Sequence, residues 1–266
     1  MRNPKAEKAP HTAARTEPVT LKVLSYNIHK GFGPSRLKLV LKEIKTAIQA
    51  VHADLVLLQE VVGHHTSPSR QFDDWPDASQ FEYLADSIWS HYAYARNSAY
   101  ASGHHGNAIL SKYPILFWEH IDLSTTRFDK KGLLHAILDL PGHATPTHAI
   151  CLHLGLFEAT RRAQTRALCR RIETAVPRTA PLIIGGDFND WRQRVGHALE
   201  GELGLTEAFR ATQGHHARSF PSWLPLLKLD RIYTRGFEST ATRCLKGPLW
   251  RKLSDHAPIY AELTLK

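Results

Sequence analysis

Acidic, amide and imidazole side chains recur at the ends of apolar segments in this 266-residue chain. Each apolar segment has the length and composition of a buried strand. Where several strands end at one edge of a sheet, the polar groups beside them meet and can form a site. The groups in these positions are Asn27, Glu60, His153, Asp187, Asn189, Asp230, Asp255 and His256.

The four carboxylates of this set would repel one another in a shared pocket and raise one another's pKa. A hard divalent cation removes that repulsion, and oxygen ligands favour Mg²⁺, with Mn²⁺ as a substitute, over zinc. Two histidines beside such a metal suit phosphodiester hydrolysis, which needs an activated water and stabilisation of charge on phosphorus. Taken singly, each group is more typical of a helix cap or a turn, so the interpretation depends on the complete set.

The segment PLIIGGDFNDW, residues 181–191, shows the pattern at its densest. An apolar strand ends there in two glycines, which we expect to leave room for an approaching substrate. On an extended chain Asp187 and Asn189 would point to one side and Asp190 to the other. Asp187 and Asn189 are therefore candidate site residues, and Asp190 is expected to be structural.

The elements that must position these groups are mostly strands. Clustered strands with few helices favour a sheet-rich, layered α/β domain over a regular alternation of strands and helices. Residues 61–80 are expected to form a loop. Strands are expected at residues 19–29, 54–60, 106–115, 131–140, 147–155, 229–235, 257–265 and from 181, and helices at 36–51, 81–91, 158–175 and within 195–213.

Composition places the chain among ordinary globular proteins, with 42 % apolar residues and a formal charge of +9. The positive charge favours a polyanionic partner such as nucleic acid or an anionic lipid headgroup. Three cysteines are too few for a disulfide framework or a zinc site. No stretch reaches the ~18 apolar residues of a membrane span.

The first 20 residues lack the apolar core of a secretory signal. We expect a disordered, mildly basic tail at residues 1–20 and a single catalytic domain at 21–266. A cytoplasmic location follows by default. The oligomeric state is not indicated by the sequence.

Six short motifs that contain these polar groups follow one another along the chain: SYNIHKG, LLQE, CLHLG, GGDFND, LDRIY and SDHAPI. This set resembles the endonuclease/exonuclease/phosphatase superfamily, which includes deoxyribonucleases, sphingomyelinases and inositol polyphosphate phosphatases. The similarity runs from Leu21 to Leu265 and is strongest to small, uncharacterised bacterial members. It implies a four-layered α/β sandwich, in which two mainly antiparallel sheets pack face to face with helices outside.

The resemblance also implies roles for single residues. Glu60, helped by Asn27 and Asp255, would hold Mg²⁺. Among the implied catalytic residues, Asp187 would activate the attacking water, and Asn189 would position the water or the phosphate. His256, braced by Asp230, would stabilise the transition state. His153 matches a second catalytic histidine of the deoxyribonuclease branch.

The substrate would be chosen by loops around this core. Candidate substrate-binding residues are His29, Lys30, Asn107, Tyr113, Arg127, Phe220 and Trp223. The aromatic residues before Asp230 could stack on a base or lie against a lipid. Five arginines on the helix at 158–175 could track a nucleic-acid backbone, although a solubilising helix face explains them equally well.

The sequence therefore predicts a Mg²⁺-dependent phosphodiester hydrolase, with DNA as the first candidate substrate and a nuclease as the first candidate activity. A phosphodiesterase or phosphatase acting on a phospholipid or inositol phosphate is the second hypothesis. A catalytically inactive binding protein of the same fold is the third, and the intact set of polar residues argues against it.

Overall fold

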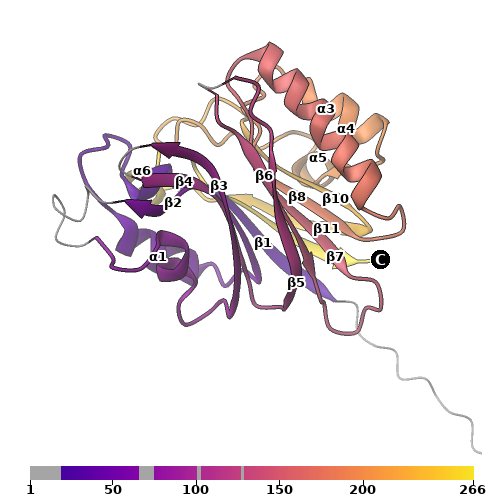
Figure 1. The fold of residues 1–266 in the computed structure, drawn as a ribbon, viewed down its shortest axis with the longest axis horizontal. Helices are drawn as coiled ribbons and strands as arrows, with labels where there is room; N and C mark the ends of the chain where they lie inside the picture. Colours follow the sequence, from indigo (N-terminus) through magenta and orange to yellow (C-terminus); the bar gives the residue numbers. More distant parts are fainter. Residues whose placement is uncertain (1–18, 66–74, 101–102, 127–128) are drawn as a thin grey trace, which may run out of the picture.

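The computed structural model describes residues 19–65, 75–100, 103–126 and 129–266. Over these residues the chain forms two sheets of six strands each, which pack face to face between outer layers of helices (Figure 1). The predicted four-layered α/β sandwich is confirmed. The part of the predicted tail before residue 19 lies outside the described residues.

The first sheet is built around β1, which carries Asn27 at its end. β1 pairs in parallel with β2 and antiparallel with β12, and the other neighbours in this sheet are antiparallel. The strand order is β11 (Phe237–Cys244), β12 (Ile259–Leu265), β1 (Thr20–Asn27), β2 (Leu55–His65), β4 (Gly103–Ser111) and β3 (His91–Tyr100).

The second sheet has the same plan, with one parallel pair, β7 and β8, at its centre. The remaining pairs are antiparallel. The strand order is β5 (Ile115–Asp122), β6 (Gly132–Leu138), β7 (Thr147–His153), β8 (Leu182–Asp187), β10 (Asp230–Arg235) and β9 (Thr206–Glu207).

Three apolar layers hold the sandwich together. The central layer joins the two sheets through residues such as Leu57 and Ile183, while Ile44 and Leu168 belong to the layers under the helices on either side. Helices α1 (Leu41–Ala50), α2 (Gln80–Ala85) and α6 (Trp250–Leu253) cover the first sheet, and α3 (Glu158–Ala175) and α4 (Val195–Gly201) cover the second (Figure 1). The short η1 (His29–Gly31) follows β1, and α5 (Ala208–Gln213) follows β9.

The two glycines of β8 allow close backbone packing, and the expectation that they make room for substrate is wrong. A Cβ on Gly185 would lie 2.5 Å from a methyl carbon of Leu57 in the opposite sheet. A Cβ on Gly186 would lie 1.9 Å from the carbonyl oxygen of Leu152 in β7. Gly186 also has a φ of 151°, a backbone angle that residues with a side chain rarely adopt. The glycines therefore set how closely β8 approaches its neighbours.

Several predicted boundaries differ from the structure. Strands β3, β5, β9 and β11 were not expected, and β2 continues to residue 65 through the predicted loop. The helix predicted at 81–91 is the shorter α2, and the helix predicted at 36–51 begins only at Leu41.

Among the described residues, no helix has both the length and the apolar character needed to cross a membrane.

Candidate functional site

Strand register brings the predicted polar groups together at one end of the sandwich. Asp187 ends β8 and is paired with Asp230, the first residue of the antiparallel β10. His153 ends β7 and is paired with Asp187 across the parallel ladder. Asn27 ends β1 in the opposite sheet and lies within hydrogen-bond distance of Asp187. The strand ends of both sheets therefore form one buried polar cluster.

Asp187 is the centre of this cluster. Its Oδ2 lies 3.3 Å from the amide nitrogen of Asn27, 3.4 Å from Nε2 of His153 and 3.7 Å from Nε2 of His256. The other ring nitrogen of His256, Nδ1, lies 2.8 Å from Oδ2 of Asp230. His256 is thus held between two carboxylates, and only 5 % of its surface is exposed.

This packing shifts the pKa values of His256 and Asp187, the two groups at the centre of the cluster. Burial lowers the pKa of His256, but the stronger combined attraction of Asp230 and Asp187 raises it to about 10. Burial raises the pKa of Asp187 to about 6, and the charge of His256 limits that rise. At neutral pH, His256 is a cation and Asp187 is a carboxylate that accepts a proton readily.

His153 is set up in the opposite way. Burial pushes the pKa of its imidazole well below the usual value, and the neighbouring Lys131 pushes it further. The Lys131 ammonium lies 2.9 Å from Nε2 of His153. Burial also lowers the pKa of Lys131, while Asp187 and Glu60 act against that shift. The site therefore holds one charged and one neutral imidazole, and Nε2 of each lies near the same oxygen of Asp187.

Asn189 does not continue an extended strand, so the expectation that it points the same way as Asp187 is wrong. Its φ is 50°, and its backbone N–H donates to Oδ1 of Asp187 at 2.9 Å. Its side-chain amide donates to the carbonyl of Leu154 at 2.9 Å. Asn189 thereby fixes the Asp187 carboxylate and joins the loops after β7 and β8, which leaves its amide oxygen for other contacts.

Asp190 is structural, as predicted. Its carboxylate accepts from the backbone N–H groups of Arg194 and Val195 at the start of α4. It also accepts from the fully buried guanidinium of Arg231 at 3.1 Å. Arg231 donates in addition to the carbonyls of Asp190 and Lys228, so it ties the loop after β8 to the loop before β10.

Glu60 lies at a register shift in β2, between Leu58 and Val61, with a φ of 56°. Burial raises the pKa of its carboxyl, but the charges of Lys30 and Lys131 bring it below the usual value. The carboxylate is therefore ionised in a strongly cationic neighbourhood.

Asp255 and Asn27 both contact His29, the residue that opens η1 after β1. Nδ1 of His29 lies 3.9 Å from Oδ1 of Asp255, and its backbone N–H donates to Oδ1 of Asn27. The charge of His29 also contributes to the lowered pKa of Glu60. Two of the three predicted metal ligands therefore contact His29, and the third is close enough to feel its charge. Their carboxylate and amide oxygens are donors of the kind that Mg²⁺ prefers.

A second group of atoms with metal-binding potential is Asp187, Asp230 and His256, whose ligand atoms lie within 4.8 Å of one another. Oδ1 of Asp230 is buried and has no hydrogen-bond partner among the described residues. However, both ring nitrogens of His256 already face carboxylates. A metal on the imidazole would displace one of these contacts, so this group is better suited to proton transfer.

The predicted substrate-binding residues divide into those near the cluster and those elsewhere. His29 and Lys30 lie beside Glu60, and the Phe220 ring lies 4.9 Å from the His256 ring. Trp223 is exposed three residues further along the same loop. Asn107 is fully buried below the site, where its amide donates to the carbonyls of β6 and β7. Its amide nitrogen therefore joins the two sheets, and its assignment as a substrate-binding residue stays a prediction.

Tyr113 is placed away from the site, so its predicted role as a substrate-binding residue is wrong. It follows β4, whose last residue, Ser111, is paired with Leu55 at the start of β2. Glu60 is five residues further along β2, which corresponds to about 16 Å. Tyr113 instead packs against the central core, as Ile115 does. Arg127 lies outside the described residues.

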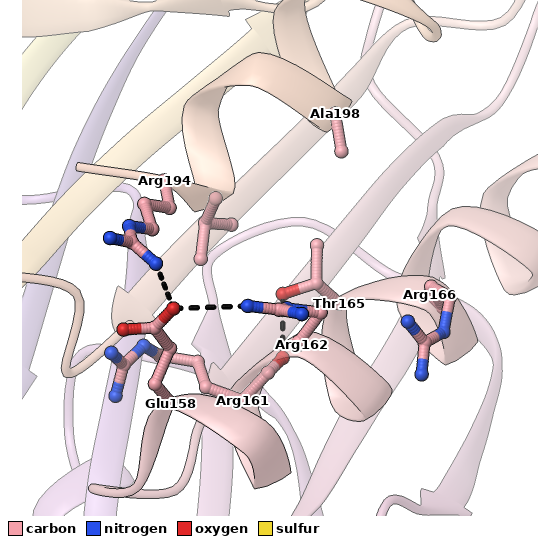
Figure 2. Close-up of a pocket in the computed structure, with 8 residues that line it drawn as sticks. Glu158, Arg161, Arg162, Thr165, Arg166, Arg194 and Ala198 are labelled. Atoms are coloured by element: carbon pink, nitrogen blue, oxygen red, sulfur yellow. Dashed lines mark hydrogen bonds and ion pairs between the residues drawn. The ribbon is translucent and has the colours of Figure 1, made fainter. Parts of the chain in front are cut away.

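The arginines of α3 do not form one exposed face. Arg161 is buried and donates to the carbonyls of Gly155 and Leu156, and Arg171 contacts Glu119 and His135. Arg162 lies at the surface beside Glu158, which also accepts from Arg194 (Figure 2). Glu158, Arg161, Arg162 and Arg194 are among the residues that line a pocket of about 170 Å³ between α3 and α4.

Lys131 and Ser219 were not among the predicted catalytic or metal-binding residues. Lys131 lies 2.9 Å from Nε2 of His153, beside Asp187. Ser219 donates through its hydroxyl to Asp230, beside His256. No motif marks either residue, because each reaches the cluster from a loop that tertiary structure alone brings there.

Comparison with known proteins now adds the family. The model of the Endonuclease/Exonuclease/phosphatase family matches residues 24–256, from β1 to the imidazole of His256. The chain belongs to this family. A relative, the Uncharacterized protein YbhP of Escherichia coli strain K12, is 44 % identical over 251 residues, which cover 94 % of this chain and 99 % of that protein.

Solved structures of the family share the fold at low sequence identity. The endonuclease/exonuclease/phosphatase from Beutenbergia cavernae aligns with a TM-score of 0.75 at 19 % identity, covering 92 % of this chain and 72 % of that one. The human Nocturnin catalytic domain, solved with bound sulfate, aligns at 0.70 and 18 %, covering 93 % and 95 %. D. rerio TDP2, solved with a single-strand DNA product, aligns at 0.65 and 20 %, covering 92 % and 98 %.

Proposed function

We propose that this family member is a Mg²⁺-dependent phosphodiester hydrolase. The observation that carries the proposal is the buried row of Asp230, His256 and Asp187, in which a charged imidazole lies between two carboxylates. Such an arrangement places a proton acceptor and a cationic donor within a few ångströms of one another. Hydrolysis of a phosphodiester requires these two groups at the attacking water and at the phosphoryl oxygens.

In the proposed reaction, Asp187 accepts a proton from water as the water oxygen bonds to phosphorus. Asn27 and the backbone N–H of Asn189 hold the carboxylate in place. His256, kept charged by Asp230, donates a hydrogen bond to a non-bridging phosphoryl oxygen. The bond from phosphorus to the leaving oxygen then breaks, and we assign protonation of that oxygen to the pair of Lys131 and His153.

We assign the Mg²⁺ ligands to Glu60, Asn27 and Asp255, with Mn²⁺ as a substitute. Bound there, the metal would supply a Lewis acid for the phosphoryl group. Lys30 and Lys131 lie close enough to Glu60 to lower its pKa. Their ammonium groups, together with the metal, would offset the negative charge of the bound phosphate. This mixed metal and ammonium environment suits a substrate with more than one anionic oxygen.

DNA is the first candidate substrate. The overall charge of +9 and the basic residues Lys30 and Lys131 at the site support it. The ring of Phe220 beside His256 offers a surface on which a base could stack. The burial of Arg161 removes part of the support, because that side chain cannot contact a nucleic-acid backbone.

A phospholipid is the second candidate, favoured by one observation. The loop that leads into Asp230 exposes several large apolar side chains, including Trp223 and Leu226, next to the catalytic cluster. DNA offers little apolar surface to aliphatic side chains such as Leu226, whereas a lipid does.

The test is hydrolysis of supercoiled plasmid, of a phospholipid panel and of bis(p-nitrophenyl) phosphate, each with Mg²⁺ and with EDTA. The proposal expects turnover of at least one of these diesters that stops in EDTA. Turnover that continues in EDTA would exclude the metal-dependent mechanism. If the protein at micromolar concentration cleaves none of the three, the proposed hydrolase function is wrong.

A further inference from the structure

Five consecutive residues, Trp223 to Leu227, form an exposed apolar loop at the mouth of the site. We call this segment the WLPLL loop. Trp223 is 59 % exposed, Leu224 50 %, Leu226 56 % and Leu227 40 %. Single exposed leucines are ordinary on protein surfaces, but four large apolar side chains in one short loop form a patch that marks an interaction site.

The loop is held in this exposed shape by its own backbone. The carbonyl of Phe220 accepts from the N–H groups of Leu226 and Leu227, and the carbonyl of Pro221 accepts from Leu224. Below it, the Ser222 hydroxyl donates to the carbonyl of Ser254 at 2.6 Å. The apolar side chains are therefore presented to solvent by a fixed turn, although the same chain buries most of its other leucines.

The base of the loop touches the catalytic residues. Ser219, which precedes the loop in the chain, donates to Asp230, and the adjoining Phe220 ring lies 4.9 Å from the His256 ring. The backbone N–H of Ser222 donates to the carbonyl of Asp255 at 2.7 Å. Whatever covers the WLPLL loop is thereby brought to the opening of the site.

Neighbouring loops add further exposed apolar groups. Leu156 and Phe157 follow β7, and Trp191 follows β8, and all three are exposed. Arg231 links the carbonyl of Asp190, beside Trp191, to that of Lys228 at the end of the WLPLL loop. Apolar side chains from three loops therefore border the same end of the second sheet.

Positive charge surrounds this apolar border. Arg162, Arg192 and Arg194 all contact the single carboxylate of Glu158 at the start of α3, and each of these arginine side chains is more than half exposed. Figure 2 shows Arg162 and Arg194 at Glu158. Three cations against one anion leave a net charge of +2 beside Phe157 and Trp191. A flat partner that is both apolar and anionic complements this surface.

From these observations we propose that the WLPLL loop inserts into the surface of an anionic phospholipid bilayer, with the flanking arginines on the lipid headgroups. Tryptophan and leucine enter the interface between headgroups and acyl chains, and arginine pairs with the phosphates above it. DNA suits the arginines but not the leucines, since aliphatic side chains do not stack on bases. A bilayer suits both.

This inference rests on the proposed hydrolase function only for its consequence, which is that it favours the second candidate substrate, a phospholipid whose headgroup diester would be presented to Asp187 and His256. Insertion of the loop would place the site at headgroup level. Docking itself requires no turnover, so the two ideas can fail separately.

The experiment is co-sedimentation of the full chain with vesicles in EDTA, where metal-dependent hydrolysis is absent. Vesicles of phosphatidylcholine with phosphatidylglycerol are compared with vesicles of phosphatidylcholine alone and with a fluorescent oligonucleotide. The test variant is Leu224→Ser with Leu226→Ser. The matched control is Leu116→Ser with Phe117→Ser, an equally exposed apolar pair on β5, and thermal unfolding shows that each variant is folded.

The proposal expects binding to the phosphatidylglycerol vesicles that weakens with salt and falls at least ~10-fold in the loop variant, because each leucine loses its buried apolar area. The β5 control should bind like the unmodified chain. Trp223→Phe should remove most of the blue shift in tryptophan fluorescence that vesicles cause.

Failure to bind anionic vesicles, or equal binding by the loop variant, would overturn the proposal. So would a loop variant that loses oligonucleotide binding while vesicle binding is unchanged, because the loop would then contact nucleic acid. If vesicles bind but no diester is hydrolysed with Mg²⁺, the docking inference stands and the proposed hydrolase function fails.

Discussion

The ammonium group of Lys131 lies 2.9 Å from Nε2 of His153, at the edge of the catalytic cluster. The same ring nitrogen lies 3.4 Å from Oδ2 of Asp187. Nε2 can either accept from the ammonium or donate to the carboxylate, but it cannot do both at once. Lys131, His153 and Asp187 therefore share protons as one unit, and a change at any of them alters the other two.

Replacing Lys131 with Met tests this unit. The substitution keeps the apolar stem and removes the charge that lowers the pKa of both His153 and Asp187. Both pKa values should rise, so the acidic limb of the kcat/KM profile should move to higher pH, with a loss of ~10-fold or more at neutral pH. Lys130→Met, at the exposed neighbouring position, is the control. An unchanged pH profile in the Lys131 variant would mean that the ammonium has no part in the reaction.

Loss of either central catalytic group should be more damaging. Asp187→Ala removes the proton acceptor and His256→Ala removes the cationic donor, and each should lower kcat by ~10² or more. Because the pKa of Asp187 is about 6, activity of the unmodified protein should fall as the pH drops below about 6. Steady-state rates on bis(p-nitrophenyl) phosphate measure both effects, with Asp139→Ala as the control for an exposed carboxylate. A decrease of less than tenfold in either variant would contradict its assigned role.

The catalytic core could be predicted because the polar groups are tied to apolar strands. Strand ends have recognisable sequences, and the pairing of Asp187 with both His153 and Asp230 follows once those strands are neighbours. Tyr113 was misplaced for the opposite reason. It follows an apolar run as well, but antiparallel pairing puts that end of β4 beside the start of β2. The sequence identifies a strand end but does not say which edge of the sheet it reaches.

The missed strands share one physical feature, which is their place at a sheet edge. β3 and β11 border the first sheet, and β5 and β9 border the second. An edge strand has one neighbour, so it carries polar and exposed residues that weaken the apolar pattern. β5, for example, has no fully buried residue. The central strands, buried on both faces, were all recognised from their apolar runs.

Metal binding can be tested apart from catalysis. Glu60→Gln removes the charge of one proposed Mg²⁺ ligand while keeping its size, so affinity for Mg²⁺ or Mn²⁺ measured by calorimetry should fall at least tenfold. His256→Ala should bind the metal with nearly unchanged affinity, because Asp230 and Asp187 keep the imidazole protonated and a protonated ring offers no lone pair to a metal. The reverse result would place the metal in the group formed by Asp187, Asp230 and His256.

A buried histidine pair far from the site should make the fold sensitive to acid. Nδ1 of His135 accepts from the guanidinium of Arg171, so its Nε2–H donates to His148 at 2.8 Å. This arrangement requires a neutral His135, and burial, followed by the nearby His148, lowers its pKa from 6.5 to about 4.

The sign of the pH effect follows from that shift. Between pH 6.5 and about 4 the unfolded chain binds a proton at His135 and the folded chain does not. The free energy of unfolding should therefore decrease as the pH is lowered from 6.5 to about 4, by roughly 3 kcal/mol from His135 alone. His135→Gln can keep both hydrogen bonds without titrating, so its urea unfolding should depend less on pH, whereas the exposed His197→Gln should behave like the unmodified chain. Parallel pH curves for His135→Gln and the unmodified chain would show that His135 does not control acid stability.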